Sequence, residues 1–383
     1  MSQSFRMTEY SHLSETQREL LAHARELGRE VLQPLAEKGA PGRINRPLVR
    51  ALGEQGLLER VLPSEGEGSA VDLCLLREGL AYGCTEAETA LALQGLGGYP
   101  ILRAARLEIR EAWIPRLAAG EAVAAFALSE PQAGSDAAAL ALRADRDGDG
   151  FRLTGTKIWI SNAPEADVYT VFARTTEGAG ARGVTAFAVP RESEGVSGEA
   201  LELLSPHPIG RLEFDGVFVD AEQVLGEVDK GFSVAMETLD LFRPSVGALA
   251  VGMAQASLDA AVSYAARREA FGHPLSEFQA VAHQLADVAV NVQAARLLVH
   301  DAAAAYDAGV RPVRQASAMA KLFATETAQH AVDVAIQVHG ARALERGHLL
   351  EHLYREVRAP RIYEGASEVQ REIIARELFK ETV

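Results

Sequence analysis

The hydrophobic period of this chain changes twice along its length, and this order limits the folds that it can adopt. Residues 14–117 place apolar residues at helical spacing, and glycine and proline clusters such as 95–100 divide them into several helices. Short β-rich runs follow from about residue 121, and long helical runs return beyond residue 230. We therefore predict a mainly α fold with a central β-domain: a helical domain at 1–120, a β-domain at 121–228 and a helical bundle at 229–383.

Local signals place the ends of several elements. The segments Ser14-Glu15-Thr16-Gln17 and Ser276-Glu277-Phe278-Gln279 both have the form of a capping box, which predicts a helix start at each serine. Another helix, over about 316–339, is expected to stop at Gly340. Runs of strand-like composition predict strands at 123–128, 139–144, 151–153, 168–173, 184–189 and 211–219.

The composition is that of an ordinary globular protein. The chain has 383 residues, of which 48% are hydrophobic and 24% charged, enough for two or three domains. A net charge of −15 disfavours nucleic acid and anionic membranes as main partners. The two cysteines, Cys74 and Cys84, fit small buried residues in a reducing compartment. Residues 1–20 lack the apolar core of a secretion signal, and no uninterrupted apolar run reaches the roughly 18 residues of a membrane span, so we expect a soluble, cytoplasmic protein.

Three motif matches have simpler structural explanations. Residues 145–150 match the start of a calcium loop, but Thr156 stands at the twelfth position, where a glutamate belongs, so we predict a hairpin turn. Residues 178–183 spell G-x-G-x-x-G but lead into a strand, which favours a second hairpin loop over a phosphate site. The segment His348-Leu349-Leu350-Glu351-His352 has the H-x-x-E-H form of some zinc proteases without an evident third ligand. We predict no metal site.

The segment Ile362-Tyr363-Glu364-Gly365-Ala366-Ser367 sets one carboxylate in a glycine-containing break between two helical runs. The run before it is basic and interrupted by Pro360, and the run after it resumes helical spacing at Val369, Ile373 and Leu378. A carboxylate held in such a connection can act as a base, although most glutamates in loops are only solvated surface groups. Two distant segments favour the functional interpretation.

These two segments combine small residues, hydroxyl groups and one large aromatic ring. In the first, a strand-like run over 125–128 breaks into a small-residue loop over 129–136, which lets backbone amides approach a ligand closely. In the second, over 155–163, strand alternation places Lys157, Trp159 and Ser161 on one face. An aromatic plane beside a hydroxyl suits a flat heteroaromatic ligand. Taken singly, each segment also fits a plain turn or a tryptophan packed in a sheet.

In this order and spacing, the three segments resemble the acyl-CoA dehydrogenase family. The resemblance covers nearly the whole chain and includes the stretches 231–244, 267–272 and 337–340. It implies an N-terminal helical domain, a middle β-barrel or sandwich domain and a C-terminal four-helix bundle, in the order that the hydrophobic periods predict.

The resemblance implies an α,β-dehydrogenation of an acyl-CoA thioester to the trans-2-enoyl-CoA. This reaction removes a proton from Cα and a hydride from Cβ, and because no side chain accepts hydride, a flavin is required, here FAD. Glu364 corresponds to the catalytic base, and the family's oxyanion donors are the flavin ribityl hydroxyl and the backbone N–H of this glutamate. Closure of the site over an acyl chain is expected to exclude water and raise the pKa of the base.

The resemblance also assigns contacts with the cofactor and the substrate. Residues 126–129 and 159–161 are expected around the flavin ring, with Ser161 near N5 and Ser129 near the pyrimidine edge. Arg268, Phe271 and Gln279 are expected to reach the dinucleotide portion from a neighbouring subunit, and Gln337 and Gly340 are expected near the adenosine end. The expected cofactor residues are Phe126, Leu128, Ser129, Trp159, Ile160, Ser161, Arg268, Phe271, Gln279, Gln337, Gly340, Ala366 and Glu368. The expected substrate contacts are Ser135, Asp240, Arg243, Tyr363 and Gly365.

Several positions depart from the family pattern. Residues 341–344 read Ala-Arg-Ala-Leu where the family has glycine, any residue, glycine and an aromatic, so the backbone is less free to approach the cofactor. Ala366 stands where a threonine is frequent and removes one hydroxyl from the flavin environment. Some relatives carry the base on the helix of Arg243, but Phe242 occupies that neighbourhood, which favours Glu364. Arg243 is expected to steady the Glu364 loop.

The first hypothesis is therefore an FAD-dependent acyl-CoA dehydrogenase of fatty acid metabolism. Its reduced flavin would pass electrons to an electron-transfer flavoprotein, and the protein would form a homodimer or homotetramer. Three alternatives stay open at this point. The substrate could be an acyl or aminoacyl group on a carrier protein, electrons could pass directly to oxygen as in an acyl-CoA oxidase, or the chain could be a non-catalytic flavin-binding scaffold.

Overall fold

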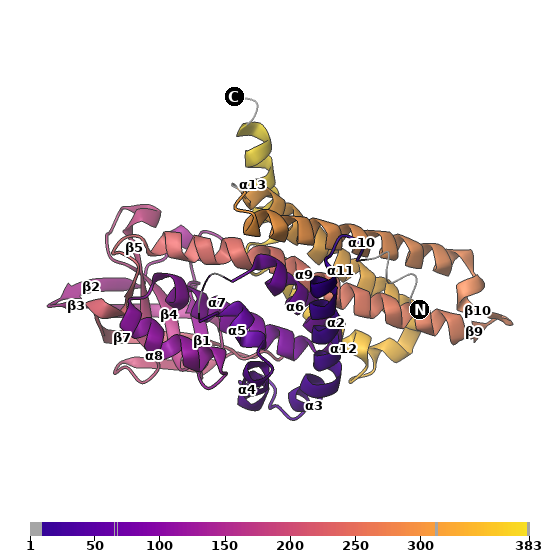
Figure 1. The fold of residues 1–383 in the computed structure, drawn as a ribbon, viewed down its shortest axis with the longest axis horizontal. Helices are drawn as coiled ribbons and strands as arrows, with labels where there is room; N and C mark the ends of the chain where they lie inside the picture. The colour runs from indigo at the N-terminus through magenta and orange to yellow at the C-terminus, as the bar shows by residue number, and fades with distance from the viewer. Residues whose placement is uncertain (1–9, 65, 67, 311–312, 381–383) are drawn as a thin grey trace. The chain divides into compact units, whose positions relative to one another are not determined.

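The computed structural model describes residues 10–64, 66, 68–310 and 313–380, and Figure 1 traces them as a ribbon. The chain divides into two compact units. The first contains Met1–Gln33, Ser69–Glu88 and Asp240–Val383, and the second contains Pro34–Gly68 and Thr89–Leu239. The expectation of no secretion signal concerns residues 1–20, and residues 1–9 of this stretch lie outside the described residues.

The first unit consists mainly of helices and short helical turns, with one two-stranded hairpin, β9 (Glu269–Ala270) and β10 (His273–Pro274). Helix α10 packs on α11, α11 packs on α13, and α2 packs on α6. The approach of α2 to α6 is close, because a Cβ atom at Gly79 would lie only 2.6 Å from the Cβ of Ala24. The elements are α2 (Glu15–Leu27), η1 (Gly28–Leu32), α6 (Ala70–Gly83), η5 (Leu275–Glu277), α10 (Gln279–Asp307), α11 (Arg314–His339), η6 (Gly340–Leu344), α12 (Leu349–Glu356), η7 (Ala359–Arg361) and α13 (Ser367–Lys380).

Of the two predicted capping boxes, one is confirmed and one is wrong. The Ser14 hydroxyl accepts a hydrogen bond from the backbone N of Gln17 (3.2 Å), and the Gln17 side chain accepts one from the backbone N of Ser14 (2.9 Å). Ser276 instead lies in the 3₁₀ turn η5, and α10 begins at Gln279 with Phe278 at the N-cap and no side-chain cap. Ser276 therefore belongs to the turn that precedes α10 and does not cap the helix.

Helix α9 (Gly231–Arg267) is long and apolar enough to cross a membrane by length and composition, which the search for uninterrupted apolar runs overlooked. However, 83% of its most apolar window is buried inside the protein. Polar residues such as Thr238, Ser245 and Ser257 are buried along the same helix. A helix buried to this extent is typical of a protein core.

The second unit combines short helices with one eight-stranded sheet. Seven strands follow the order β6-β7-β3-β2-β4-β5-β8, and β1 pairs in parallel with β4. Strands β4 and β5 form the predicted hairpin across 178–183, and β2 and β3 form the predicted hairpin across 148–149. The strands are β1 (Ala124–Ala127), β2 (Arg143–Asp147), β3 (Gly150–Ser161), β4 (Val168–Arg174), β5 (Val184–Pro190), β6 (Val196–Ala200), β7 (Ile209–Asp220) and β8 (Val224–Leu225), and the helices are α3 (Gln33–Ala36), α4 (Arg46–Glu54), α5 (Leu57–Val61) and α8 (Leu107–Ala118).

Two local predictions in this part of the chain are wrong. Helix α7 (Thr85–Ala104) runs through the expected break at 95–100. Its glycines serve close packing, because a Cβ at Gly97 would lie 2.6 Å from the backbone N of Ala125 in β1. The expected strand at 139–144 is largely a 3₁₀ turn, η2 (Ala137–Ala139), and an extended link that leads into β2. The helical, strand-rich and again helical order of the whole chain is confirmed.

Candidate active site

Glu364 lies in a short loop between η7 and α13, with an unusual backbone conformation. Its φ is +50°, and the next residue, Gly365, has a φ of +91°. A glutamate in the left-handed region is uncommon and persists only where its surroundings hold it there. Such residues are enriched at functional sites, so the backbone itself draws attention to this loop.

Two buried side chains hold the carbonyl groups of the loop. The Gln370 amide Nε2 donates to the Glu364 carbonyl (3.1 Å) and to the Gly365 carbonyl (2.9 Å). The Lys321 ammonium also donates to the Gly365 carbonyl (2.6 Å). Glu326 fixes the flanks of the loop, because it accepts a hydrogen bond from the Ser367 hydroxyl (2.8 Å) and pairs with Arg361 (2.8 Å). The strained backbone is thus held from several sides.

The Glu364 carboxylate combines partial burial with an available oxygen. Its Oε2 atom is buried and has no hydrogen-bond partner among the residues that the structure describes. Burial raises the pKa of this carboxyl above its ordinary value, and the positive charges of Arg77, Lys321 and Arg243 oppose that rise. A carboxylate with a raised pKa and a free oxygen is suited to take up a proton.

The cations near Glu364 are themselves paired or buried. Arg243 is buried and pairs with Asp240 (3.3 Å), so two of the expected substrate residues do lie together, and burial lowers the pKa of this arginine. Arg77 pairs with Glu88 and donates to the Ser245 hydroxyl (2.7 Å) inside the same unit. The hydrogen bonds that hold the Glu364 loop come from Lys321 and Gln370, whereas Arg243 acts on Glu364 through its charge.

The two segments predicted to bind the flavin ring meet in the second unit. The backbone N of Ile158 donates to the Ser129 carbonyl (3.0 Å), and the Lys157 ammonium donates to the Leu128 carbonyl (3.0 Å). Glu130 is buried and accepts hydrogen bonds from Lys157 (2.8 Å) and from the backbone N of Leu142 (3.0 Å). The structure therefore brings residues 126–130 and 157–161 side by side. Phe126 also packs on Phe172, with ring centroids 4.8 Å apart.

The prediction that Lys157, Trp159 and Ser161 share one face is wrong for Lys157. A β-bulge interrupts the pairing of β3 with β7 between Lys157 and Ile160, and Trp159 has a φ of +60°. As a result, Lys157 is buried against Glu130, whereas the Trp159 side chain is 54% exposed. Burial lowers the pKa of Lys157 to about 8. The bulge turns the tryptophan ring outward, with Ile160 buried and Ser161 half-buried beside it.

The segment predicted to reach a neighbouring subunit is an exposed turn between α9 and α10. Strands β9 (Glu269–Ala270) and β10 (His273–Pro274) form a small hairpin whose tip carries Phe271 and Gly272. Phe271 is 94% exposed and has a φ of +53°. Its ring packs edge-on against that of Phe278, with ring centroids 6.4 Å apart. Arg268 and Gln279 are exposed, and no ion pair to Arg268 occurs among the described residues.

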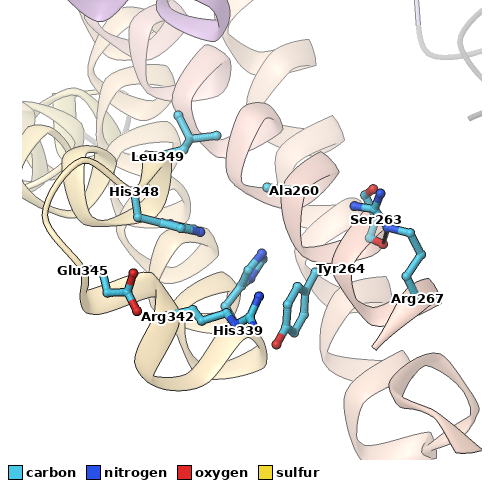
Figure 2. A pocket seen from close by; sticks show the side chains of 9 residues that line it. All are labelled: Ala260, Ser263, Tyr264, Arg267, His339, Arg342, Glu345, His348 and Leu349. Atoms are coloured by element: carbon cyan, nitrogen blue, oxygen red, sulfur yellow. Dashed lines mark hydrogen bonds between the residues drawn. The ribbon is translucent and has the colours of Figure 1, made fainter. Parts of the chain in front are cut away.

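Gln337 and Gly340 lie at the C-terminal end of α11, where His339 lines a cavity of about 700 Å³. Figure 2 shows the side chains that line it, among them Tyr264, His339 and His348. The Tyr264 and His339 rings are stacked with centroids 4.2 Å apart, and His339 Nδ1 lies 2.8 Å from the Ala335 carbonyl. The cavity also borders Arg342, one of the positions that depart from the family pattern.

Within the first unit, this end of α11 is far from the Glu364 loop. Lys321 contacts the loop, and sixteen residues (337 − 321) at about 1.5 Å each separate it from Gln337 by about 24 Å along the helix. The remaining predicted residues lie close to Glu364 in sequence or on the surface. Tyr363 is 40% exposed, Ala366 is half-buried, Glu368 pairs with Arg371 (3.6 Å) and Ser135 is exposed.

The H-x-x-E-H segment makes two unrelated sets of contacts. His348 caps α12 by accepting a hydrogen bond from the backbone N of Leu350 (3.1 Å), and His352 lies 2.6 Å from the Thr85 hydroxyl. Among the described residues, no group of three or more His, Cys, Asp or Glu side chains is arranged to hold a metal ion. The two histidines have structural partners instead.

Sequence patterns alone missed Arg77, Lys321 and Gln370, which surround Glu364. A signal for Lys321 exists, because it lies among Ser317, Ala318 and Ala324 on the buried face of α11, where a lysine is rare. No comparable signal marks Gln370, because polar residues are ordinary in the first turns of a surface helix.

Models of known protein families match nearly the whole chain. The acyl-CoA dehydrogenase N-terminal domain matches residues 14–121, the middle domain 125–217 and the C-terminal domain 229–379. The chain belongs to the acyl-CoA dehydrogenase family. It is therefore an oxidoreductase of a flavoprotein family, and its architecture is the three-domain fold of that family.

Individual relatives are similar over most of their length. The cyclohexane-1-carbonyl-CoA dehydrogenase of Geobacter metallireducens is 36% identical over 93% of this chain and 96% of its own length. The mitochondrial short-chain specific acyl-CoA dehydrogenase of Sus scrofa is 37% identical over 96% of this chain and 91% of its own. The names of these two relatives give different acyl substrates, although their sequence identity to this chain is almost equal. Identity at this level therefore does not indicate which acyl group this chain would bind.

Solved structures give the same family. Butyryl-CoA dehydrogenase from Megasphaera elsdenii aligns with a TM-score of 0.89 and 32% identity, covering 96% of this chain and 99% of its own. The FAD complex of PigA aligns with a TM-score of 0.89 and 26% identity, covering 96% and 98%. A chain from a study of the electron transferring flavoprotein of Acidaminococcus fermentans aligns with a TM-score of 0.90 and 34% identity, covering 96% and 98%.

The family is FAD-dependent, and the residues of this chain fit such a cofactor. An outward-facing Trp159 with the half-buried hydroxyl of Ser161 suits a flat ring, and the exposed guanidinium of Arg268 suits a pyrophosphate. Ala366 has no hydroxyl group to offer to the cofactor.

Proposed function

We propose that this protein oxidises an acyl-CoA thioester to its trans-2-enoyl form, with FAD as cofactor and Glu364 as the base. The observation that carries the proposal is the state of Glu364. Its carboxylate has a buried oxygen without a hydrogen-bond partner in the described part of the chain, lies on a strained loop held by Lys321 and Gln370, and has a raised pKa. A structural glutamate would be expected to have its oxygens paired.

In the proposed reaction, Glu364 removes the proton from Cα of the thioester. The raised pKa of the carboxyl narrows the gap to the weakly acidic Cα–H, which favours the transfer. As the proton leaves, negative charge moves onto the thioester carbonyl oxygen, and the backbone N–H of Glu364 is proposed to donate to it. Bound FAD would supply the acceptor for the hydride that leaves Cβ.

We propose that the second unit holds the flavin ring through Phe126, Leu128, Ser129, Trp159, Ile160 and Ser161. The hydrogen bonds between residues 128–130 and 157–158 support this proposal, because they fix the two segments against each other. Ala366 and Glu368 would contribute from the start of α13. For the substrate, Asp240 and Arg243, which are paired, would face the CoA entrance together with Ser135, Tyr363 and Gly365.

The proposal extends to assembly. Arg268, Phe271 and Gln279 would reach the cofactor of a second copy, and Gln337 and Gly340 would serve its adenosine end, so the protein would be a dimer or tetramer. The exposed Phe271 and the distance of about 24 Å between Lys321 and Gln337 support this arrangement. The expected domain limits, 1–120, 121–228 and 229–383, are kept as part of the proposal.

We propose that the reduced flavin passes its electrons to an electron-transfer flavoprotein in the cytoplasm. The structural neighbour from the Acidaminococcus fermentans study supports this partner, because that study concerns an electron transferring flavoprotein. Rapid formation of peroxide in air by the thioester-reduced protein would favour the oxidase alternative instead.

The test is the anaerobic absorbance of the purified protein before and after addition of acyl-CoA thioesters that differ in length and branching. Bleaching of the flavin by one group of thioesters, with no response to free CoA, supports the reaction and names its substrate class. A yellow protein that no CoA ester bleaches would move the substrate to a carrier protein. A colourless protein that cannot be loaded with FAD would contradict the proposal.

A further inference from the structure

Lys321 occupies a position that a structural role alone does not account for. It is fully buried on α11, among the small side chains of Ser317, Ala318 and Ala324, where an apolar residue would be expected. Burial of a lysine without a close carboxylate partner costs free energy, and among the described residues no salt bridge to Lys321 occurs within 4.0 Å. In the part of the chain that the structure describes, the hydrogen bond of its ammonium group runs to the Gly365 carbonyl (2.6 Å).

The hydrogen bond and the charge of Lys321 both act on the same loop. The ammonium donates to the carbonyl of the residue after Glu364, and its positive charge opposes the rise in the pKa of the Glu364 carboxyl. The interaction is reciprocal, because burial lowers the pKa of Lys321 to about 8 while the charge of Glu364 opposes that fall. At neutral pH the lysine is therefore still mostly charged.

The other charged groups near Glu364 have partners of their own. Arg77 on α6 pairs with Glu88 on α7, and Arg243 on α9 pairs with Asp240. On the side of Lys321, Glu326 is bound to Arg361 and Ser367, and Glu368 is bound to Arg371. Tyr363 adjoins Glu364 in the loop. Lys321 thus differs from the two arginines, whose charges are balanced by a neighbouring carboxylate.

We propose that Lys321 is a positioning residue for the base: it fixes the Gly365 carbonyl and, by its charge, keeps the Glu364 carboxylate ionised for proton removal. The inference rests on the proposed function of Glu364 and adds a residue to it. Loss of the lysine charge should leave a larger fraction of Glu364 protonated at neutral pH, so the acid limb of the rate profile should move to higher pH.

The experiment compares Lys321→Met, Lys321→Arg and Ser367→Ala with the wild type. Lys321→Met removes the charge and the hydrogen bond at similar volume, and Lys321→Arg keeps a charge. Ser367→Ala is the matched control, because it removes the bond from Ser367 to Glu326 (2.8 Å) and loosens the loop without changing a charge. Anaerobic flavin bleaching is measured against pH with one reactive acyl-CoA.

We expect Lys321→Met to slow bleaching at pH 7 by about tenfold and to shift the acid limb to higher pH. Lys321→Arg should keep the wild-type midpoint, and Ser367→Ala should slow bleaching without moving the midpoint. A midpoint that stays unchanged in Lys321→Met, or that moves equally in Ser367→Ala, would overturn the proposal.

A second measurement separates this proposal from the proposed function. Infrared titration of the substrate-free protein isolates the Glu364 carboxyl when the same titration of Glu364→Gln is subtracted, with the subtraction repeated in the Lys321→Met background. The titration midpoint of Glu364 should be higher in Lys321→Met. This result supports the role of Lys321 even if no thioester bleaches the wild type, and coincident midpoints would refute it even if the wild type proves to be a dehydrogenase.

Discussion

The Glu364 loop and the Phe271 turn share a pattern of positive φ values but differ in what supports it. In both, a non-glycine residue in the left-handed region precedes a glycine: Glu364 and Gly365 have φ values of +50° and +91°, and Phe271 and Gly272 have +53° and +85°. Buried side chains hold the first pair by three hydrogen bonds, whereas Phe271 is 94% exposed. The Glu364 loop is held by residues of its own chain, and we infer that the Phe271 turn contacts a second copy of the chain.

The difference is visible in the space around the two glycines. A Cβ at Gly365 would lie 2.3 Å from the Gln370 amide Nε2, whereas a Cβ at Gly272 would have no atom within 4 Å. The same pattern of positive φ values is therefore enclosed by protein at one site and open at the other. Strain that the fold holds in place suits a group that must be positioned, and an open aromatic tip suits a contact with another molecule.

Among the substitutions that compare the two loops, Gly365→Ala should have the largest effect. The new methyl group displaces Gln370, releases two hydrogen bonds and adds left-handed strain of about 1–3 kcal/mol, so we expect flavin bleaching to slow by roughly a hundredfold. Gly272→Ala is the matched control, because it adds similar strain in open space, and its bleaching rate should stay within about twofold. Equal losses in both variants would remove the distinction between the two loops.

A smaller effect is expected from Phe271→Ser. Because the ring is 94% exposed, the substitution should leave the folding of one subunit intact but weaken subunit association and flavin retention by about tenfold. Sedimentation and the rate of FAD release measure both quantities. Leu107→Ser, which alters another exposed apolar side chain, is the control, and a Phe271→Ser protein with wild-type association and retention would mean that no second copy uses this turn.

The smallest effect concerns thermal stability and pH. Burial raises the pKa of Glu364 in the folded protein above its value in the unfolded chain, so between these two pKa values the folded state binds more protons than the unfolded state. The free energy of unfolding therefore falls as pH rises through this range. Glu364→Gln removes this penalty. At pH 7 the variant should therefore melt higher than the wild type, on the order of 2 °C, and the gap should close below about pH 4. A melting-temperature difference independent of pH would show that Glu364 is not destabilised by its ionisation.

Sequence patterns predicted the order of the elements well and their interruptions poorly. Periodicity identified β4, β5 and the capped start of α2, because these depend on neighbouring residues. It failed where contacts between residues distant in sequence determine the local structure. Gly97 reads as a break but packs on β1, and the β-bulge that separates Lys157 from Trp159 depends on the pairing with β7.

The candidate site shows the same division. The sequence predicts Glu364 because its glycine-containing break is a local signal, and two distant segments that share the family resemblance give it a role. Arg77 and Lys321 were missed because they come from α6 and α11, which only folding brings to this loop. Gln370 follows Glu364 by six residues, and it was missed because no local pattern marks it as buried. Two of the three side chains that support the base therefore depend on packing between segments far apart in sequence.

The most direct test of the central claim is anaerobic mixing of FAD-loaded wild type and Glu364→Gln with one thioester that bleaches the wild type. The amide keeps the size of the side chain but cannot accept the Cα proton. We expect both proteins to bind FAD and the variant to bleach slower by about a thousandfold or more. Bleaching of Glu364→Gln at a rate near that of the wild type would contradict the assignment of Glu364 as the base.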